Sequence, residues 1–196
     1  MTFDKSRKKQ GYFALGAWIA AIPDEVQAAF WEGGLLLIVG LVGLAARIPL
    51  LLASLGPTAY EQTEMPHLKS SRPYNVIIGH IAGLAAGFLA IALVHAWNAP
   101  KVLAAGQLTS ARLWACVIAA ALTSFVTVVL RASQPAALAT TLLVALGSLQ
   151  TKQDACIVVG AVLLLAVIGE PVRRLRLAKR TISSRQTKIS MLHVRG

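Results

Sequence analysis

Two short polar stretches, each built around a proline, interrupt an otherwise apolar chain. They read ASLGPTA at residues 53–59 and ASQPAA at residues 132–137. A helix that begins at such a proline has free backbone N–H groups and the positive end of its dipole at its start. Both features attract anions, so each stretch is a candidate anion site. Neutral donors there would be Ser54, Thr58, Ser133, Gln134, Thr140 and Thr141, although Ser and Thr also let helices pack closely.

A third stretch, SRPYNVIIGHIAGLAAG at residues 71–87, places polar residues at the start of a long apolar segment. Asn75 is suited to cap a helix. His80 either makes a structural hydrogen bond or lies near a polar entrance at the end of the helix. Arg72 is the cation most expected to meet a substrate. Small residues four apart predict close approach of another helix. They are Gly79, Gly83 and Gly87.

The composition places the chain in the membrane class. Its 196 residues are 56% hydrophobic and only 14% charged, against about 25% charged in a typical soluble domain. Residues 1–10 carry a net charge of +3 and residues 172–196 of +8, which accounts for the whole +11. Basic ends that flank an apolar body argue against nucleic-acid binding. They predict two cytoplasmic termini that also attract anionic lipid.

Four long apolar segments, residues 28–46, 75–97, 111–130 and 155–169, predict an all-α, multi-pass membrane protein. The last is expected to end at Glu170 and Pro171. The two short proline segments either re-enter the protein, giving four crossings and parallel halves, or cross, giving six crossings and inverted halves. Length favours four spans plus two half-helices, whereas the count of basic residues in the loops slightly favours six.

The predicted division has three parts. Residues 1–27 form a basic N-terminus with an interfacial helix, residues 28–171 the membrane domain, and residues 172–196 a basic cytoplasmic tail. The membrane domain repeats the order of its landmarks between residues 28–97 and 111–171. Ser54 and Ser133 are 79 residues apart, and Pro57 and Pro135 are 78 apart. Such an internal repeat is typical of transporters.

Other chemistry has little support in the sequence. Cys116 and Cys156 lie in separate apolar segments, which indicates buried thiols rather than a disulfide or a metal site. The histidines lie too far apart for a metal cluster. We find no nucleophile–base motif or nucleotide-binding loop, and therefore expect no cofactor and no enzymatic activity.

Residues 54–80 resemble the first signature of the HPP family of integral membrane proteins. The matching residues are Ser54, Gly56, Thr58, Ala59, Pro73, Asn75, Val76, Gly79 and His80. The family's second signature, which begins His-Pro-Pro, falls on residues 133–140. There the first three residues read Ser133-Gln134-Pro135, so only the last proline is kept. The resemblance implies about four spans and a transporter; some photosynthetic members are associated with nitrite.

We therefore expect a transporter of a small solute, such as the inorganic anion nitrite, in the inner (plasma) membrane. The alternative is a membrane scaffold that holds lipid or a protein partner through its basic tail, with the glycine ridge forming a homo-oligomer. The predicted substrate-binding residues are Ser54, Gly56, Thr58, Arg72, Asn75, His80, Ser133, Gln134 and Thr140.

Overall fold

The structure, a computed structural model, describes the backbone of residues 23–194 and the side chains of residues 23–181. The predicted interfacial helix lies outside the described residues. Within them the chain is entirely helical. The long helices are α2 (Asp24–Ala46), α4 (Pro73–Leu93), α6 (Ser110–Val129) and α8 (Lys152–Val194); the short ones are α3 (Leu55–Glu64), η1 (Ala96–Asn98), α5 (Val102–Ala105) and α7 (Ala137–Ala145).

The four long helices are each long and apolar enough to cross a membrane. This confirms the predicted fold class of four long helices plus two short ones. The half-helices α3 and α7 have 10 and 9 residues, about 15 Å at 1.5 Å per residue, and so cannot span a hydrocarbon core of about 30 Å. The element order of α2–α3–α4 recurs in α6–α7–α8, although the internal repeat itself remains a prediction.

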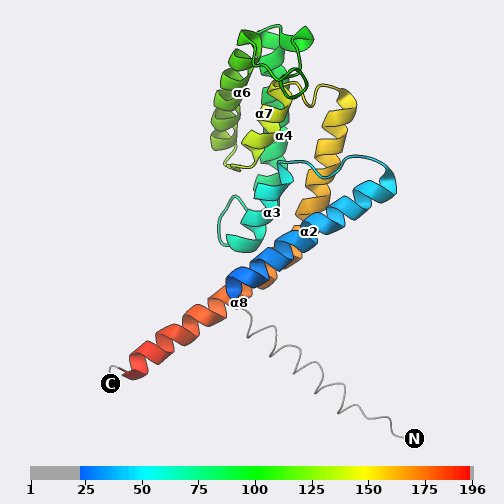
Figure 1. The fold of residues 1–196 in the computed structure, drawn as a ribbon. Helices are drawn as coiled ribbons and strands as arrows, with labels where there is room; N and C mark the ends of the chain where they lie inside the picture. Colours follow the sequence, from blue (N-terminus) through cyan, green and yellow to red (C-terminus); the bar gives the residue numbers. More distant parts are fainter. Residues whose placement is uncertain (1–22, 195–196) are drawn as a thin grey trace, which may run out of the picture.

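Helix α4 is the centre of the fold, because α6, α7 and α8 all pack against it (Figure 1). Its glycines and alanines make this close packing feasible. Helix α2 instead lies along α3 and α8, and leaves most of its apolar surface uncovered by protein. Thus α4, α6 and α7 form a tight bundle, whereas α3 packs mainly against α2 and α8.

The first long helix of each half ends in the same way. Arg47 after α2 and Arg131 after α6 adopt left-handed backbone conformations, with φ values of 57° and 52°. Pro57 lies in the first turn of α3, where its missing N–H breaks no intrahelical hydrogen bond. Pro135 lies in the hydrogen-bonded turn that leads into α7.

Helix α8 differs most from expectation. It continues through Pro171 and does not end there, so the basic segment that follows is helical. A proline inside a helix costs about 3 kcal/mol. Contacts from this segment to α2 and α3 offset that cost, as described below. At the other end, α2 begins at Asp24 rather than at the predicted residue 28.

Candidate functional site

His80 is the centre of a buried polar cluster that joins the two short helices. Its side chain is only 1% exposed. Its Nε2 lies 3.0 Å from Oγ1 of Thr58 in α3, and its Nδ1 lies 2.7 Å from Oγ1 of Thr140 in α7. His80 therefore links α3 and α7 through hydrogen bonds from a mostly apolar helix, α4.

Counting hydrogens fixes the direction of each bond in this cluster. The Thr58 hydroxyl donates its one hydrogen to the carbonyl oxygen of Ser54, 3.1 Å away. It must therefore accept from His80, which places the imidazole hydrogen on Nε2. The Nδ1 atom is then an acceptor, and the Thr140 hydroxyl donates to it. We assign His80 as a neutral imidazole with both nitrogens satisfied.

The surroundings of His80 are apolar beyond its two threonines. A small void beside the ring is lined by side chains of α4 and α8 and is too narrow for a water molecule. These side chains are Ile77, Ile81, Leu84, Val158, Val159, Val162 and Leu163. The cluster is therefore enclosed, and a solute reaches it only if the helices move.

Four more buried side chains near the short helices carry a polar atom with no hydrogen-bond partner among the described residues. They are Oγ of Ser54, Oε2 of Glu61 and the amide groups of Gln62 and Gln134. Ser54, Thr58 and Gln62 are spaced four apart, so they share the inward face of α3. An unsatisfied buried polar group costs about 1–3 kcal/mol. The inward face of α3 therefore carries hydrogen-bonding groups that do not stabilise the fold and are available to a ligand.

A cavity with several hydroxyl and amide residues in its wall lies beside α7, between α6 and the turn that precedes α7. Its volume is about 210 Å³. It is lined by Thr123, Ser124, Thr127, Val128, Ser133, Gln134, Pro135 and Leu138. None of the charged side chains that the structure describes lines it. Its size suits a solute of a few heavy atoms, and it borders the segment that the sequence singled out.

The glycine ridge of α4 lies against α7 and the turn before it. A Cβ atom on Gly79 would lie 2.6 Å from Cβ of Gln134, and one on Gly83 would lie 2.7 Å from Oγ1 of Thr141. A Cβ atom on Gly87 would lie 2.8 Å from Cβ of Val144. These contacts bring α7 close enough for Thr140 to reach His80.

The start of α4 is tied to the segment after α6. The Asn75 amide donates to the carbonyl oxygen of Ser133 at 3.1 Å, and Tyr74 donates its hydroxyl hydrogen to that of Leu130. Asn75 is thus a link between the halves and not the N-cap, a position that Arg72 occupies. The Arg72 side chain is exposed and lies about two helical turns before the buried His80.

Gly56 likewise stands apart from the cluster, since a Cβ atom there would meet nothing within 4 Å. Of the predicted site residues, the structure brings Ser54, Thr58, His80 and Thr140 together. Gln134 and Ser133 line the neighbouring cavity.

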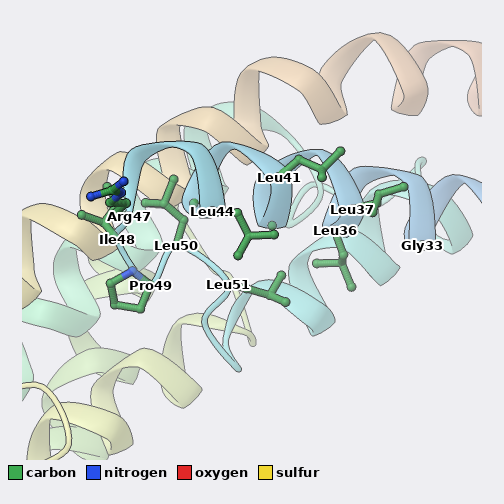
Figure 2. Close-up of a pocket in the computed structure, with 12 residues that line it drawn as sticks. Gly33, Leu36, Leu37, Leu41, Leu44, Arg47, Ile48, Pro49, Leu50 and Leu51 are labelled. Carbon is green, nitrogen blue, oxygen red and sulfur yellow. The ribbon is translucent and has the colours of Figure 1, made fainter.

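A separate groove runs along the outside of α2. Leucines of α2 and residues 48–51 line it, with Arg47 at one end (Figure 2). Its volume is about 780 Å³ and its walls are almost wholly apolar. Such a surface fits lipid chains and offers nothing to a polar solute.

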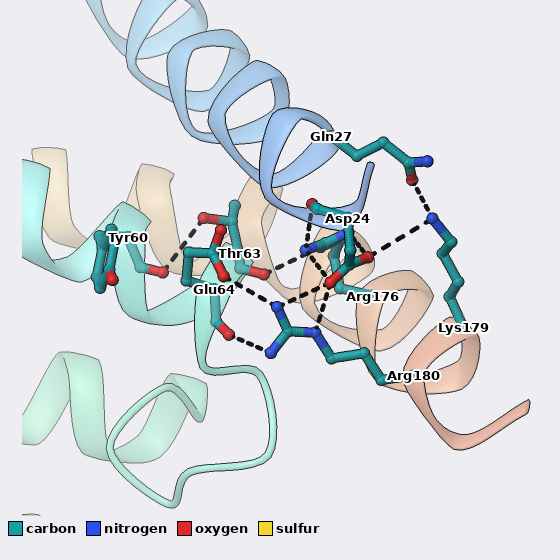
Figure 3. A network of polar contacts seen from close by, with 8 residues as sticks. All are labelled: Asp24, Gln27, Tyr60, Thr63, Glu64, Arg176, Lys179 and Arg180. Atoms are coloured by element: carbon teal, nitrogen blue, oxygen red, sulfur yellow. Dashed lines mark hydrogen bonds and ion pairs between the residues drawn. The ribbon is translucent and has the colours of Figure 1, made fainter. Parts of the chain in front are cut away.

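A cluster of charged residues fastens α8 to the start of α2 and to the end of α3 (Figure 3). The guanidinium group of Arg176, 2% exposed, donates to the Asp24 carboxylate at 2.6 and 3.0 Å. It also donates to the carbonyl oxygen of Thr63 at 3.0 Å. Arg180 contacts the carboxylates of Asp24 and Glu64, each at 2.9 Å. We call these four charged residues, Asp24, Glu64, Arg176 and Arg180, the α8 clamp.

The clamp satisfies backbone groups that would otherwise be orphaned. The last carbonyl groups of a helix have no intrahelical partner. Two of those at the end of α3, from Thr63 and Glu64, accept from Arg176 and Arg180. In addition, Arg173 donates to the carbonyl oxygen of Pro66, just beyond α3. The basic segment predicted to be a tail is therefore partly structural.

Arg112 plays a comparable structural role at the start of α6. Its buried guanidinium group donates to the carbonyl oxygens of Pro100, Ala99 and Ala145. Gly147 lies against it, with φ of 88°, and a Cβ atom there would lie 2.7 Å from Nη2 of the arginine. Arg112 thus locks the loop between the halves rather than meeting a solute.

Glu61 gives a pH-dependent prediction. Burial in α3 raises the pKa of its carboxyl group, and a hydrogen bond from Ser70 acts in the opposite direction. Because the pKa of Glu61 is raised in the folded protein, the protonated carboxyl group favours the folded state at low pH. That contribution to stability is lost as pH rises through the folded-state pKa. We expect Glu61→Gln to raise the thermal midpoint at pH 8 by about 2–4 °C, the shift of roughly 1 kcal/mol in this size range.

At pH 4.5 the same substitution should leave the midpoint nearly unchanged. Thermal scans of the detergent-solubilised protein at both pH values make the comparison. An equal gain at both would mean that the charge of Glu61 is not the cause.

Sequence reasoning missed the α8 clamp and the inward-facing Gln62. A usable signal existed for the clamp, because Asp24 is one of only eight acidic residues in the chain and stands at a helix start. No local signal pairs it with Arg176, which is 152 residues away. The inward position of Gln62 could not be inferred, since one sequence does not show which face of α3 packs against the rest of the protein.

The fold and the buried cluster define a class of protein. The chain is a multi-pass membrane protein with four long apolar helices and two half-helices that meet at a buried histidine. Residues 23–176 match the HPP transmembrane region family, and the chain belongs to that family. Comparison with curated proteins and with solved structures gave no significant match.

Proposed function

We propose that this protein transports a small solute across the inner membrane, and that the solute is an inorganic anion of the size of nitrite. The observation that carries the proposal is the meeting of α3 and α7 on His80. Non-helical ends at membrane depth are tolerated where they border a cavity or a binding site, as in the broken helices of transporters. The buried polar groups of Ser54, Gln62 and Gln134, which have no hydrogen-bond partner among the described residues, support the same assignment.

The route runs from the cavity of about 210 Å³ beside α7 toward the His80 cluster. The solute crosses unchanged, without enzymatic chemistry. Exposed Arg72 and Arg131 would raise the local concentration of anions at the start of α4 and the end of α6. The contact between Asp24 and Arg176 places the start of α2 and the basic part of α8 on one side. The positive charge of that part of α8 favours the cytoplasmic side for both.

Uptake by proteoliposomes tests the proposal, with nitrite, nitrate and chloride measured side by side. We expect saturable flux of at least one anion. Thr140→Val removes the hydroxyl that donates to His80 and should reduce that flux at least tenfold. Thr63→Val is the matched control, because within residues 23–181 the Thr63 hydroxyl bonds to carbonyl groups of its own helix alone. It should leave the flux unchanged.

Tight vesicles with no flux of any anion would favour the second candidate, a scaffold that acts through the basic end of α8. A truncation that tests the scaffold has to begin after Thr181, because Arg176 and Arg180 hold α2 and α3 in place. A transporter should keep its flux after that truncation, whereas a scaffold should lose its partner or its lipid.

A further inference from the structure

We propose that His80 binds a proton together with the transported anion, so that the protein is an electroneutral proton–anion symporter. This inference rests on the proposed function and adds the coupling ion to it. The geometry of the His80 cluster carries it, through three steps: the donor count of the neutral state, the absence of a counter-charge, and the change that a proton would make.

In the neutral state every hydrogen of the cluster is in use. Thr140 donates to Nδ1, Nε2–H donates to Thr58, and Thr58 donates to the carbonyl oxygen of Ser54. No donor of these three residues is left for an anion. The neutral cluster thus carries no charge and has no spare hydrogen-bond donor for an anion.

A proton on Nδ1 changes that arrangement at one atom. Nδ1–H then donates to Thr140, whose hydroxyl rotates and releases the hydrogen that it had donated to the ring. That freed hydrogen, together with the unpartnered hydroxyl of Ser54, can donate to an anion. Protonation therefore supplies both the positive charge and one new hydrogen-bond donor. When the anion leaves, the proton leaves Nδ1, and the Thr140 hydroxyl turns back.

Among the side chains that the structure describes, none supplies a charge to balance an imidazolium ion at this place. The side chains that face His80 from α4 and α8 are apolar, and those from α3 and α7 are threonines. Helix α7 contains no titratable residue. On α3 the nearest acid is Glu61, three residues beyond Thr58 and linked to Ser70, while Glu64 pairs with Arg180.

The titratable residues of the other packed helices face elsewhere. On α6, Arg112 binds loop carbonyl groups, and Cys116 lies one helical turn beyond it. On α8, Asp154 caps its own helix and Glu170 pairs with Arg173 and Arg174. A buried charge without a partner is strongly disfavoured. The proton and the anion therefore enter this site as a pair or not at all.

The experiment uses purified full-length protein in proteoliposomes, with nitrate as the probe because its conjugate acid is fully dissociated at the pH values used. The membrane potential is clamped with potassium and valinomycin. With the interior one pH unit more alkaline, one-to-one symport accumulates internal nitrate about tenfold, since one pH unit corresponds to a tenfold concentration ratio. Protein-free vesicles should accumulate none. Chloride and nitrite are run in parallel if nitrate is not a substrate.

His80→Gln keeps a side chain that donates and accepts but cannot carry the proton. We expect it to lose the tenfold response to the pH gradient. Saturable uptake in the wild-type protein that ignores the pH gradient would overturn the proton coupling and leave the transport function standing. Absence of any saturable uptake would overturn both. Since the wild-type comparison decides alone, a failure of the variant to fold does not weaken the test.

Discussion

Arg176→Ala is expected to destabilise the protein by about 3 kcal/mol. Removing one partner of a buried ion pair typically costs about 3–5 kcal/mol, because the remaining charge is left uncompensated. We expect the lower end, since the Asp24 side chain is 32% exposed and water can partly replace the arginine. The same substitution also leaves the carbonyl oxygen of Thr63 without its partner. The end of α3 should therefore loosen together with the start of α2.

The matched control is Arg174→Ala, two residues away on the same helix. Arg174 is 75% exposed, and its ion-pair partner among the described side chains is Glu170, one turn before it. Exposed pairs of this kind contribute about 0–1 kcal/mol. Thermal midpoints of both variants in detergent, and hydrogen exchange at residues 60–66, make the comparison. Similar losses in the two variants would show that Arg176 has no special role in the clamp.

Gly83→Leu is expected to separate α4 from α7 and to abolish any function that needs the His80 cluster. Even a Cβ atom at Gly83 would lie 2.7 Å from Oγ1 of Thr141 and 2.8 Å from the carbonyl oxygen of Ala137. Backbone cannot give way as a flexible side chain can. Overpacking of this kind costs about 1–3 kcal/mol. It would also lengthen the 2.7 Å contact between Thr140 and His80.

Gly40→Ala on α2 is the control for this prediction. A Cβ atom there meets nothing within 4 Å, so the substitution should stabilise the helix, on the order of 1 kcal/mol. The measurements are the thermal midpoint and the uptake rate of each variant. A tolerated leucine at Gly83 would mean that the two helices do not approach as closely as the structure shows.

Much of the fold could be predicted, because hydropathy and length report directly on membrane spans. The starts of α4 and α6 fall within two residues of the predicted segments, and the half-helices lie where Pro57 and Pro135 placed them. The course of α8 could not be predicted. Local rules end a helix near a proline, whereas here tertiary contacts of Arg176 and Arg180 sustain it.

The candidate site was only partly predictable for a similar reason. Residue types identified Ser54, Thr58, His80 and Thr140, since polar groups in an apolar chain are conspicuous. Their contacts depend on how α3 and α7 approach α4, and one sequence contains no such distances. Arg72 shows the limit, because its charge and position suggested a ligand, yet its side chain lies outside the cluster.

The continuity of α8 has a mechanical consequence. Its 43 residues measure about 64 Å at 1.5 Å per residue, roughly twice the thickness of a hydrocarbon core. The same continuous helix carries Val158 and Val162 beside the buried histidine and, farther along, the arginines that hold the end of α3. A displacement of its far end is therefore transmitted to the interior of the bundle through one helix, with no loop in between. A force applied at that end would act on α3 directly and on the surroundings of His80 through Val158 and Val162.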